Sequence, residues 1–419
     1  MKRRVVITGI GPAAATGLGK KDFFHNLYAL NPCISEIPKC YEQNYNFKSR
    51  YFVPKPEFSL TDWGVHKSIE GMMEEISRFS VLGAKLALED AGFNINKRNK
   101  YFQVDSLDNC AVIIGIGMSS LQTALESYAA HIADTCDTKH RFNRMVIPML
   151  MPNSAAAWIS ILFAIKGFSY TVNASCASGS IAIGEAYRKI LSGRCDAALT
   201  GGVEVLAERN GAMMRGFDML TTLTRSEDGR PLPFSNKRSG FLLNEGAGCV
   251  LVLEELQTAL KRGAHIYAEI VGYECSNEAY SIMQIDPSGE NITGLLQKLT
   301  KGINVDYINA HGTATVANDE IEAKVIQNLF GVKNKQPYIN STKGILGHSI
   351  GASGAIEAAV TAMAIKDSRI HGNLTTEPMD ELNLPLESID APINYAITAS
   401  YGFGGHNALI LLKRFNENE

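Results

Sequence analysis

The stretch Val172-Asn-Ala-Ser-Cys-Ala-Ser-Gly-Ser180 joins an expected apolar strand, 170–174, to an expected helix of small residues, 178–191. A cysteine at a helix N-terminus lies near the positive end of the helix dipole and near unpaired backbone N–H groups, which favours the thiolate form of Cys176. The same N–H groups can receive an oxyanion. On this stretch alone, a structural core cysteine is the more common case. Both interpretations of Cys176 are therefore kept open here.

The composition is that of an ordinary globular chain. Its 419 residues are 45% hydrophobic and 20% charged, which is enough for two domains or one large duplicated one. The eight cysteines contain no CxxC pair, which argues against a zinc cluster and a secreted disulfide scaffold and favours reduced thiols in the cytoplasm. The 40 basic and 43 acidic residues form no basic block, so no nucleic-acid partner is expected.

No membrane segment is expected. The first apolar run is interrupted by Thr8, Gly9, Gly11 and Pro12, so it predicts a first strand instead of a signal sequence. The longest apolar run, 155–165, is too short to span a bilayer.

Hydrophobic patterning predicts alternating strands and helices in both parts of the chain. The expected strands are 4–10, 109–117, 170–174, 196–205, 247–254, 268–273, 305–309, 338–340 and 395–399, and the expected helices are 70–92, 178–191, 320–329 and 351–365. The Pro-bearing segment 31–66 is expected to be an irregular surface excursion.

One arrangement occurs twice along the chain. A strand, a loop and a helix rich in small residues follow one another at 170–191 and again at 338–365. Small side chains let two such helices approach closely in the interior. We therefore expect two βα-rich halves, 1–255 with Cys176 and 256–419 with His311 and His348, packed helix against helix between sheets in a layered α/β fold.

Three stretches of the second half carry groups suited to catalysis. They are Asn309-Ala-His-Gly-Thr-Ala-Thr315, Ser341-Thr-Lys-Gly-Ile-Leu-Gly-His-Ser-Ile-Gly-Ala-Ser-Gly354 and Ser400-Tyr-Gly-Phe-Gly-Gly-His-Asn407. The first two place His311 after a strand and His348 before a small-residue helix. The third is a glycine loop that can present backbone N–H groups. Each has a plainer interpretation, because a lone loop histidine is usually a bystander and a glycine-rich loop is usually a turn.

Taken together, these stretches resemble the elongating I/II type of β-ketoacyl-[acyl carrier protein] synthases, which share the thiolase fold. The resemblance extends over nearly the whole chain. It includes Val5-Val-Ile-Thr-Gly-Ile-Gly11, Pro233-Phe-x-x-x-Arg-x-Gly-Phe241, Asn244-Glu-Gly-Ala-Gly248, His265-Ile-Tyr-Ala-Glu-Ile-Val-Gly272 and Gly402-Phe-Gly-Gly405. The discriminating set is Cys176, the His-Gly-Thr at 311 and the Lys-(x)4-His at 343–348. The resemblance implies a thiolase-like α-β-α-β-α sandwich made of duplicated βα halves.

The same resemblance implies a role for each site residue. Cys176 would carry the acyl chain, with an oxyanion hole formed by the backbones of Cys176 and Phe403. His311 and His348 would donate from Nε2 to a malonyl-derived enolate, and Lys343 with Glu357 would order the site. The remaining assignments concern the substrate: Thr313 and Thr315 for the phosphopantetheine arm, Phe403 for the gate of the acyl tunnel, and Met118 and Phe241 for the pocket lining.

The activity implied is a decarboxylating Claisen condensation with malonyl-[acyl carrier protein] in fatty-acid-like, polyketide or aryl-polyene elongation. No metal or dissociable redox cofactor is implied, since the substrates are carried on the phosphopantetheine of an acyl carrier protein. A dimer is expected. The alternatives are a non-catalytic chain-length partner subunit of a ketosynthase heterodimer, which the presence of Cys176 disfavours, and a thiolase acting on coenzyme A thioesters.

Departures from the family pattern bear on substrate and partner. The glycine loop ends in His406-Asn407 where Thr-Asn is usual, Asn236 stands in a usual Asp position, and 275–291 is compact. These differences favour a specialised polyketide or polyene pathway. Near the expected docking side, Thr221 replaces a common arginine.

The same docking side contains acids at Glu70, Glu74 and Glu75. We expect this acidic face to repel an acidic carrier and a related second subunit to supply part of the basic surface, giving a heterodimer. The alternative is docking on Lys67, Arg215 or Arg225.

Overall fold

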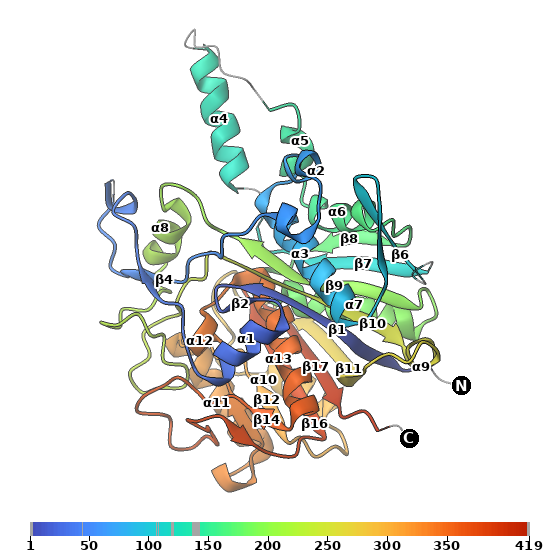
Figure 1. Ribbon diagram of the computed structural model, residues 1–419. Coiled ribbons are helices and arrows are strands. Elements are labelled where there is room, and N and C mark those ends of the chain that lie inside the picture. The colour runs from blue at the N-terminus through green and yellow to red at the C-terminus, as the bar shows by residue number, and fades with distance from the viewer. Residues whose placement is uncertain are drawn as a thin grey trace.

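The computed structural model describes residues 3–43, 45–105, 107, 109–118, 121–135 and 143–416. Ten strands form one hydrogen-bonded path in the order β13-β12-β16-β17-β11-β1-β10-β9-β7-β8. In chain order they are β1 Val5–Ala14, β7 Cys110–Gly115, β8 Ser169–Val172, β9 Ala197–Val205, β10 Gly246–Glu255, β11 Ala268–Asn277, β12 Tyr307–Asn309, β13 Tyr338–Asn340, β16 Tyr395–Gly402 and β17 His406–Lys413. Figure 1 shows this sheet region surrounded by helices.

The path consists of two five-stranded halves with the same pattern. From β1 outward through β10, β9, β7 and β8, the pairings are antiparallel, antiparallel, parallel and parallel. From β11 outward through β17, β16, β12 and β13, the same sequence of pairings recurs. The halves join where Val5 to Ile7 of β1 pair with Ala268 to Ile270 of β11. This repeat confirms the duplicated α/β architecture, whereas a division of the chain after residue 255 stays a prediction.

Two helices of small residues lie between the halves. They are α7 (Ser178–Leu191) and α13 (Ser353–Asp367), and each contacts strands of both halves as well as the other helix. Their side chains share one core with the inner faces of β1, β10, β11 and β17. The predicted buried central helix, 178–191, has the bounds found for α7.

The close approach of these helices depends on glycine. A Cβ built on Gly179 would lie 2.8 Å from the backbone nitrogen of Ala355, and one on Gly354 would lie 2.3 Å from Oγ of Ser180. Such distances leave no room for a side chain. The small residues therefore fix the spacing of the middle layer, which positions the residues at the N-terminal ends of both helices.

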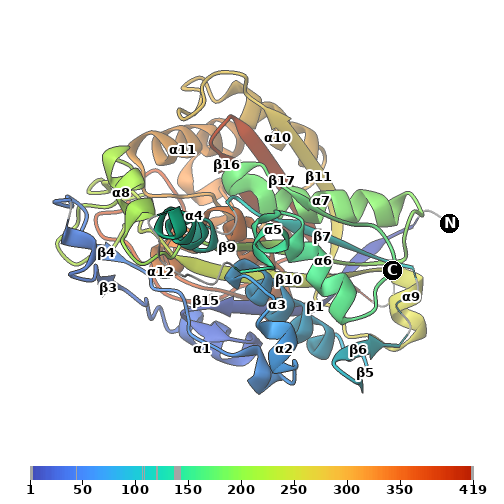
Figure 2. The same cartoon turned by 90° about the horizontal axis from the view of Figure 1, so that it is seen from above.

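Outer helices cover the two remaining faces. On the N-terminal half, α3 (Glu75–Asp90) and α6 (Ser154–Leu162) pack on β7, β9 and β10 around one core cluster. On the C-terminal half, α10 (Glu290–Leu299) and α11 (Val316–Phe330) pack on β12, β16 and β17 around another. Figure 2 shows α10 and α11 on one side of the molecule and α3 on the opposite side. The five layers predicted from the resemblance are present.

Several expectations about single elements were wrong. The expected helix 70–92 is interrupted, with α2 (Lys67–Glu70) followed by a separate α3 whose N-cap is the side chain of Glu74. Strand β17 and the helices α1 (Lys20–Tyr28), α8 (Ala212–Met219), α9 (Leu256–Lys261) and α10 were not predicted. Cys136 lies outside the described residues. Within the described ranges, no helix is long and apolar enough to cross a membrane.

One edge of the sheet and the helices beside it expose apolar side chains. Among the described strands, β8 pairs with β7 alone and ends the path. In Figure 1, α4 (Leu121–Thr135) projects from the body of the molecule; it contacts α5 (Val146–Leu150), which contacts α6, and α6 packs on β8. The exposed apolar residues on α4, α5, α6 and the segments next to α5 and β8 are Leu125, Tyr128, Ile132, Ile147, Met151, Ile161 and Phe168.

Candidate active site

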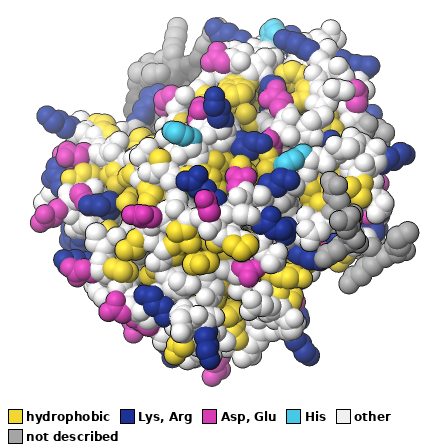
Figure 3. Space-filling model, turned by 60° about the horizontal axis from the view of Figure 1, so that its bottom comes forward, with side chains coloured by type: hydrophobic (Ala, Val, Ile, Leu, Met, Phe, Trp, Pro, Cys, Tyr) yellow, Lys and Arg dark blue, Asp and Glu magenta, His cyan; other side chains and the backbone are white. Residues whose placement is uncertain are grey.

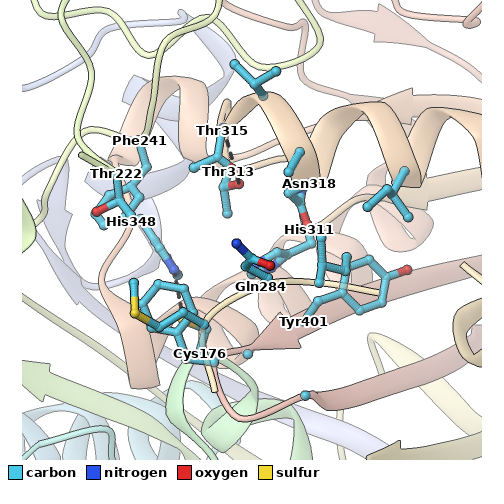
Figure 4. Close-up of a pocket in the computed structure, with 18 of the residues that line it drawn as sticks. Cys176, Thr222, Phe241, Gln284, His311, Thr313, Thr315, Asn318, His348 and Tyr401 are labelled. Atoms are coloured by element: carbon cyan, nitrogen blue, oxygen red, sulfur yellow. Dashed lines mark hydrogen bonds between the residues drawn. The ribbon is translucent and has the colours of Figure 1, made fainter. Parts of the chain in front are cut away.

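The three stretches singled out in the sequence meet at one cavity. Its volume is about 560 Å³, and Cys176, His311, His348 and Phe403 all line it. Figure 4 shows these groups arriving from different elements, with Thr313 and Thr315 toward one end and Cys176 at the other. Residues separated by more than 200 positions are thus brought together by the packing of the two halves.

Cys176 lies in the turn between β8 and α7. It belongs to a 3₁₀ turn, Ser175–Ala177, that leads directly into α7, and the residue is only 5% exposed. Ser175 has a φ of 52°, a left-handed conformation that is uncommon for a residue with a side chain. This sharp turn points the sulfur into the cavity, as the sequence predicted for a strand-to-helix junction.

The expectation of a favoured Cys176 thiolate was wrong for the resting site. Burial raises the pKa of the Cys176 thiol above its ordinary value, and the nearby carboxylate of Glu204 contributes to the rise. The Ser175 hydroxyl, the Lys343 ammonium and the backbone N–H of Phe403 each lower the pKa, but burial outweighs them. The sequence revealed the helix terminus but not the extent of desolvation.

His348 is the nearest titratable neighbour of that sulfur. Its Nε2 lies 3.2 Å from Cys176 Sγ, and its Nδ1 lies 2.9 Å from Oγ of Ser353. The backbone is held at both sides, since the His348 N–H donates to the Leu242 carbonyl and the His348 carbonyl accepts from the Asn244 N–H. The ring is therefore anchored at Nδ1 and presents Nε2 to the cavity.

His311 is held by the buried Lys343 and Glu357. Lys343 Nζ donates to the His311 carbonyl at 2.7 Å, lies 3.3 Å from His311 Nδ1, and forms an ion pair with Glu357. An ammonium group can only donate, so His311 Nδ1 accepts and the proton of the neutral ring is on Nε2. The two histidine rings lie nearly perpendicular, with centroids 5.6 Å apart. Each can thus present a nitrogen to the same space.

Burial and charge keep both rings neutral. Desolvation lowers the pKa values of His311 and His348 well below the ordinary value, and the Lys343 ammonium lowers both further. Burial raises the pKa of Glu357 to about 7, opposed by the charge of Lys343. Neutral imidazoles at pH 7 act as hydrogen-bond donors from one nitrogen only.

The other predicted site residues differ in their placement. Thr313, Thr315 and Phe241 line the cavity, and the Phe241 ring lies edge-on to His348 with centroids 5.1 Å apart. Phe403 packs against the apolar cluster that contains Cys176 and Phe241. Met118 does not line this cavity, and its side chain is 42% exposed, so its assignment to the acyl pocket stays a prediction.

Sequence reasoning missed two groups of residues. The buried carboxylate of Glu322 accepts the backbone N–H groups of His311 and Gly312, each at 2.8 Å, and so fixes the loop that carries His311. The acids that follow the His-Gly-Thr stretch were a signal for this role. The second group is the segment 278–287, whose residues line the mouth and include Gln284, drawn in Figure 4. No periodic signal marks an exposed polar residue on a loop.

The predicted acidic docking face is absent. Glu70 is buried and accepts the Leu60 N–H, and Glu74 is buried and accepts the Ile76 N–H as the N-cap of α3. Glu75 is ion-paired with Lys55. Glu70 and Glu74 thus accept from local backbone donors and Glu75 is paired with a cation, so the three acids do not form an exposed acidic face. His406, expected beside the oxyanion loop, lies close to Gly404 but outside the cavity lining.

The family profile of the beta-ketoacyl synthase N-terminal domain matches residues 2–259, and that of the beta-ketoacyl synthase C-terminal domain matches residues 267–377. A 3-oxoacyl-[acyl-carrier-protein] synthase 2 from Staphylococcus aureus is 34% identical over 99% of both chains. A protein of the same name from Synechocystis sp. is 33% identical over 99% of both chains.

Solved structures agree with these matches. A beta-ketoacyl synthase from Burkholderia phymatum superimposes with a TM-score of 0.86 at 29% identity, covering 99% of this chain and 100% of the other. The ishigamide ketosynthase/chain length factor superimposes with a TM-score of 0.85 at 26% identity and the same coverage. With the family profiles covering most of its length, the chain belongs to the beta-ketoacyl synthases.

Proposed function

We propose that the protein is a condensing acyltransferase that extends an acyl chain held on Cys176 with a malonyl unit held on an acyl carrier protein. The observation that carries the proposal is the position of His348 Nε2 at 3.2 Å from Cys176 Sγ, with His311 in the same cavity. A thiol and two neutral imidazoles at one cavity supply a nucleophile and two hydrogen-bond donors. The relatives named 3-oxoacyl-[acyl-carrier-protein] synthase 2 support this reaction class.

In the proposed first step, Cys176 attacks the thioester carbonyl of an acyl carrier. The bond between Cys176 Sγ and the carbonyl carbon forms, the bond to the carrier sulfur breaks, and the sulfhydryl proton ends on the departing carrier thiol. Negative charge develops on the carbonyl oxygen during the attack. The backbone N–H groups of Cys176 and Phe403 are proposed as its donors, since Gly402 holds the glycine loop against the Cys176 N–H.

In the proposed second step, a malonyl thioester loses CO2. The electrons of the broken C–C bond form an enolate whose oxygen accepts from Nε2–H of His311 and of His348. The enolate carbon then attacks the acyl carbonyl carbon on Cys176. The new C–C bond forms, the bond to Cys176 Sγ breaks, and the departing thiolate takes up a proton from solvent to restore the thiol. Lys343 and Glu357 act as positioning residues, because their ion pair lies behind His311 and lines no part of the cavity.

The proposal is tested by separating its two steps. Intact-protein mass spectrometry after incubation with a panel of acyl carriers is expected to show one acyl adduct, and labelled malonyl carrier is expected to release CO2. His348→Ala is expected to load the acyl group but to lose decarboxylation, since its hydrogen bond is made to the enolate. Release of CO2 by this variant at the parent rate would contradict the role of His348.

The partners belong to the same proposal. Thr313 and Thr315 are proposed to hold the phosphopantetheine arm, and the reaction draws on no metal or dissociable redox cofactor. A known ketosynthase structure, at 25% identity, is a type II PKS ketosynthase in complex with its acyl carrier protein. Exposed Lys67, Arg215 and Arg225 are proposed as the docking cations, because Glu70, Glu74 and Glu75, the acids that follow Lys67, are buried or paired. On the face in Figure 3, basic and acidic side chains are interspersed.

A dimer is proposed from the apolar face beside β8. An edge strand that is paired on one side, as β8 is with β7, and exposed apolar side chains on the neighbouring helices are typical of a surface that is covered in an assembly. The related ketosynthase/chain length factor structure makes a distinct ketosynthase-like subunit the candidate partner. The acidic face that was one argument for a heterodimer is absent, so the heterodimer is proposed from the apolar surface and the related structure alone. A location in the cytoplasm and a specialised polyketide or polyene pathway remain parts of the proposal.

A further inference from the structure

The hydroxyl of Ser353 is the one group of the described residues that hydrogen-bonds the outer nitrogen of His348. Its Oγ lies 2.9 Å from His348 Nδ1, and both residues are buried, at 4% and 2% exposure. Ser353 lines no part of the cavity, so it cannot touch a substrate there. Any effect of this hydroxyl on the reaction must act through the imidazole.

The other contacts of Ser353 limit where its hydroxyl proton can lie. The Ser349 backbone N–H donates to Ser353 Oγ at 3.1 Å, so one lone pair of that oxygen is occupied. The neighbours left for the hydroxyl proton are His348 Nδ1 at 2.9 Å and Ser349 Oγ at 3.2 Å. The Ser349 hydroxyl is itself a donor that can use the second lone pair of Ser353. Every group is satisfied when Ser349 Oγ–H donates to Ser353 Oγ and Ser353 Oγ–H donates to Nδ1. The reverse order, from Nδ1–H to Ser353 Oγ and from Ser353 Oγ–H to Ser349 Oγ, also satisfies them, and the ¹⁵N measurement below distinguishes the two.

Ser178, in the N-terminal half, is placed like Ser353, and the direction of both of its hydrogen bonds is defined because its partners are backbone groups. Ser178 is the first residue of α7, as Ser353 is the first residue of α13, and each follows a 3₁₀ turn. Ser178 Oγ accepts the backbone N–H four residues earlier, at 2.8 Å, and donates to the Ser175 carbonyl at 2.6 Å. A serine at this position therefore accepts from the backbone and donates its proton elsewhere. At Ser353 the receiving atom is a histidine nitrogen.

We propose that Ser353 is a positioning residue that holds His348 in the Nε2–H tautomer by donating its hydroxyl proton to Nδ1. In a neutral imidazole, the tautomer is set by the hydrogen bond that the other nitrogen makes. With Nδ1 accepting, Nε2 must carry the proton and donates toward Cys176 Sγ in the resting site. After acylation of the cysteine, the same N–H is directed at the enolate oxygen. This inference rests on the proposed function.

The donors to Nδ1 of the two histidines then differ in charge. His311 Nδ1 accepts from the ammonium of Lys343, whereas His348 Nδ1 accepts from a neutral hydroxyl. Both rings present Nε2–H, but the donor behind His348 brings no charge next to the reacting cysteine. Removing the hydroxyl should therefore weaken the control of the tautomer without changing the net charge of the site.

The test compares Ser353→Ala with the matched control Ser349→Ala. Both remove one buried hydroxyl from the same pair, but only the first removes the partner of Nδ1. We expect Ser353→Ala to lower kcat for malonyl decarboxylation roughly tenfold, about the value of one hydrogen bond. KM for the malonyl carrier and the yield of the acyl adduct are expected to stay near the parent values. Ser349→Ala is expected to keep the parent kcat, and thermal unfolding checks that both variants fold.

Histidine side-chain ¹⁵N chemical shifts give a readout that a purely structural role would not move. In the parent, the His348 signal, assigned by its absence in His348→Gln, is expected to show an unprotonated Nδ1 and a protonated Nε2. In Ser353→Ala, the two shifts are expected to move toward an average of both tautomers, and in Ser349→Ala they are expected to stay. A parent with protonated Nδ1, or a Ser353→Ala variant with parent shifts and parent kcat, would overturn the proposal. A parent that releases no CO2 would overturn the proposed function instead.

Discussion

Nζ of Lys343 lies 2.7 Å from the carbonyl oxygen of His311 and 3.3 Å from Nδ1 of the same residue. One buried ammonium thus fixes both the backbone and the tautomer of the ring. It also lowers the pKa values of His311 and His348 by its charge. The cation therefore contributes to the site without lining the cavity.

Replacing Lys343 by Met is expected to make decarboxylation sensitive to pH. Burial is the larger cause of the low His311 pKa and remains in the variant, but loss of the ammonium removes the second cause, so this pKa rises and the protonated ring forms at a higher pH than in the parent. We expect the rate of CO2 release to fall at least about tenfold and to decline further as the pH is lowered toward about 5. Because the variant leaves Glu357 buried and unpaired, Lys343→Met/Glu357→Gln serves as the control for stability. A variant with the parent's pH profile would contradict the electrostatic role.

Cys176→Ala is expected to abolish acyl loading. No other cysteine of the described residues lines the cavity, so an acyl carrier has no alternative thiol there. The measurement is intact-protein mass spectrometry after incubation with an acyl carrier. Cys40→Ala, which removes an exposed cysteine, is the matched control and should retain the full adduct. An adduct on the Cys176→Ala protein would show that the nucleophile was assigned wrongly.

The two half-reactions are expected to differ in their dependence on pH. The pKa of Cys176 is raised by burial, so the reactive thiolate becomes more abundant as the pH increases, and the rate of acyl loading should climb from pH 7 to pH 9. The pKa values of His311 and His348 are lowered by burial, so both rings stay neutral down to pH 6. Malonyl decarboxylation should then be nearly constant from pH 6 to pH 8. Stopped assays of each half-reaction over this range check both statements.

The sequence predicted those elements whose type and burial follow from their local composition alone. Helix α7 was predicted with the correct bounds because its glycines, alanines and serines admit only a buried, closely packed helix. Strand β17 was missed: it forms a hairpin with β16 across a glycine turn that was interpreted only as a loop, and its other partner, β11, lies far earlier in the chain. Pairings of that kind are properties of the whole sheet.

The candidate active site also contains residues that the sequence could predict and properties that it could not. The meeting of Cys176, His311 and His348 at one cavity agrees with the sequence analysis, which singled them out because each stands next to a small-residue helix or a glycine, whereas their catalytic roles stay a prediction. The pKa of Cys176 and the burial of Glu70 and Glu74 could not, because desolvation and capping depend on neighbours that the chain brings in from elsewhere. From the sequence alone, a glutamate that caps a helix cannot be distinguished from one that faces a partner protein.

Gly179→Val is expected to destabilise the whole protein. A side chain there would collide with the backbone of Ala355 and with the carbonyl of Gly351, 2.8 and 3.0 Å from the ideal Cβ, so α7 and α13 would have to separate. Overpacking of this kind costs about 1–3 kcal/mol of unfolding free energy. Gly294→Ala on α10 is the control, because nothing lies within 4 Å of its Cβ, and it should be stabilising by roughly 0.5–1 kcal/mol. Chemical denaturation of both variants provides the comparison.

Arg225→Glu is expected to impair the use of carrier-bound malonyl but not of malonyl-pantetheine. Arg225 is exposed on the loop after α8, close in sequence to Thr221 and Thr222, which line the cavity. A cation at that place attracts an acidic carrier mainly by raising the association rate, so the charge reversal should lower kcat/KM for the carrier substrate about tenfold at low salt. The loss should shrink as ionic strength rises, because surface charges are screened. Lys261→Glu on α9, an exposed lysine away from the cavity lining, is the matched control and should leave kcat/KM unchanged. Equal losses with both substrates would place Arg225 in the chemistry of the site, and no loss with either would remove it from the docking surface.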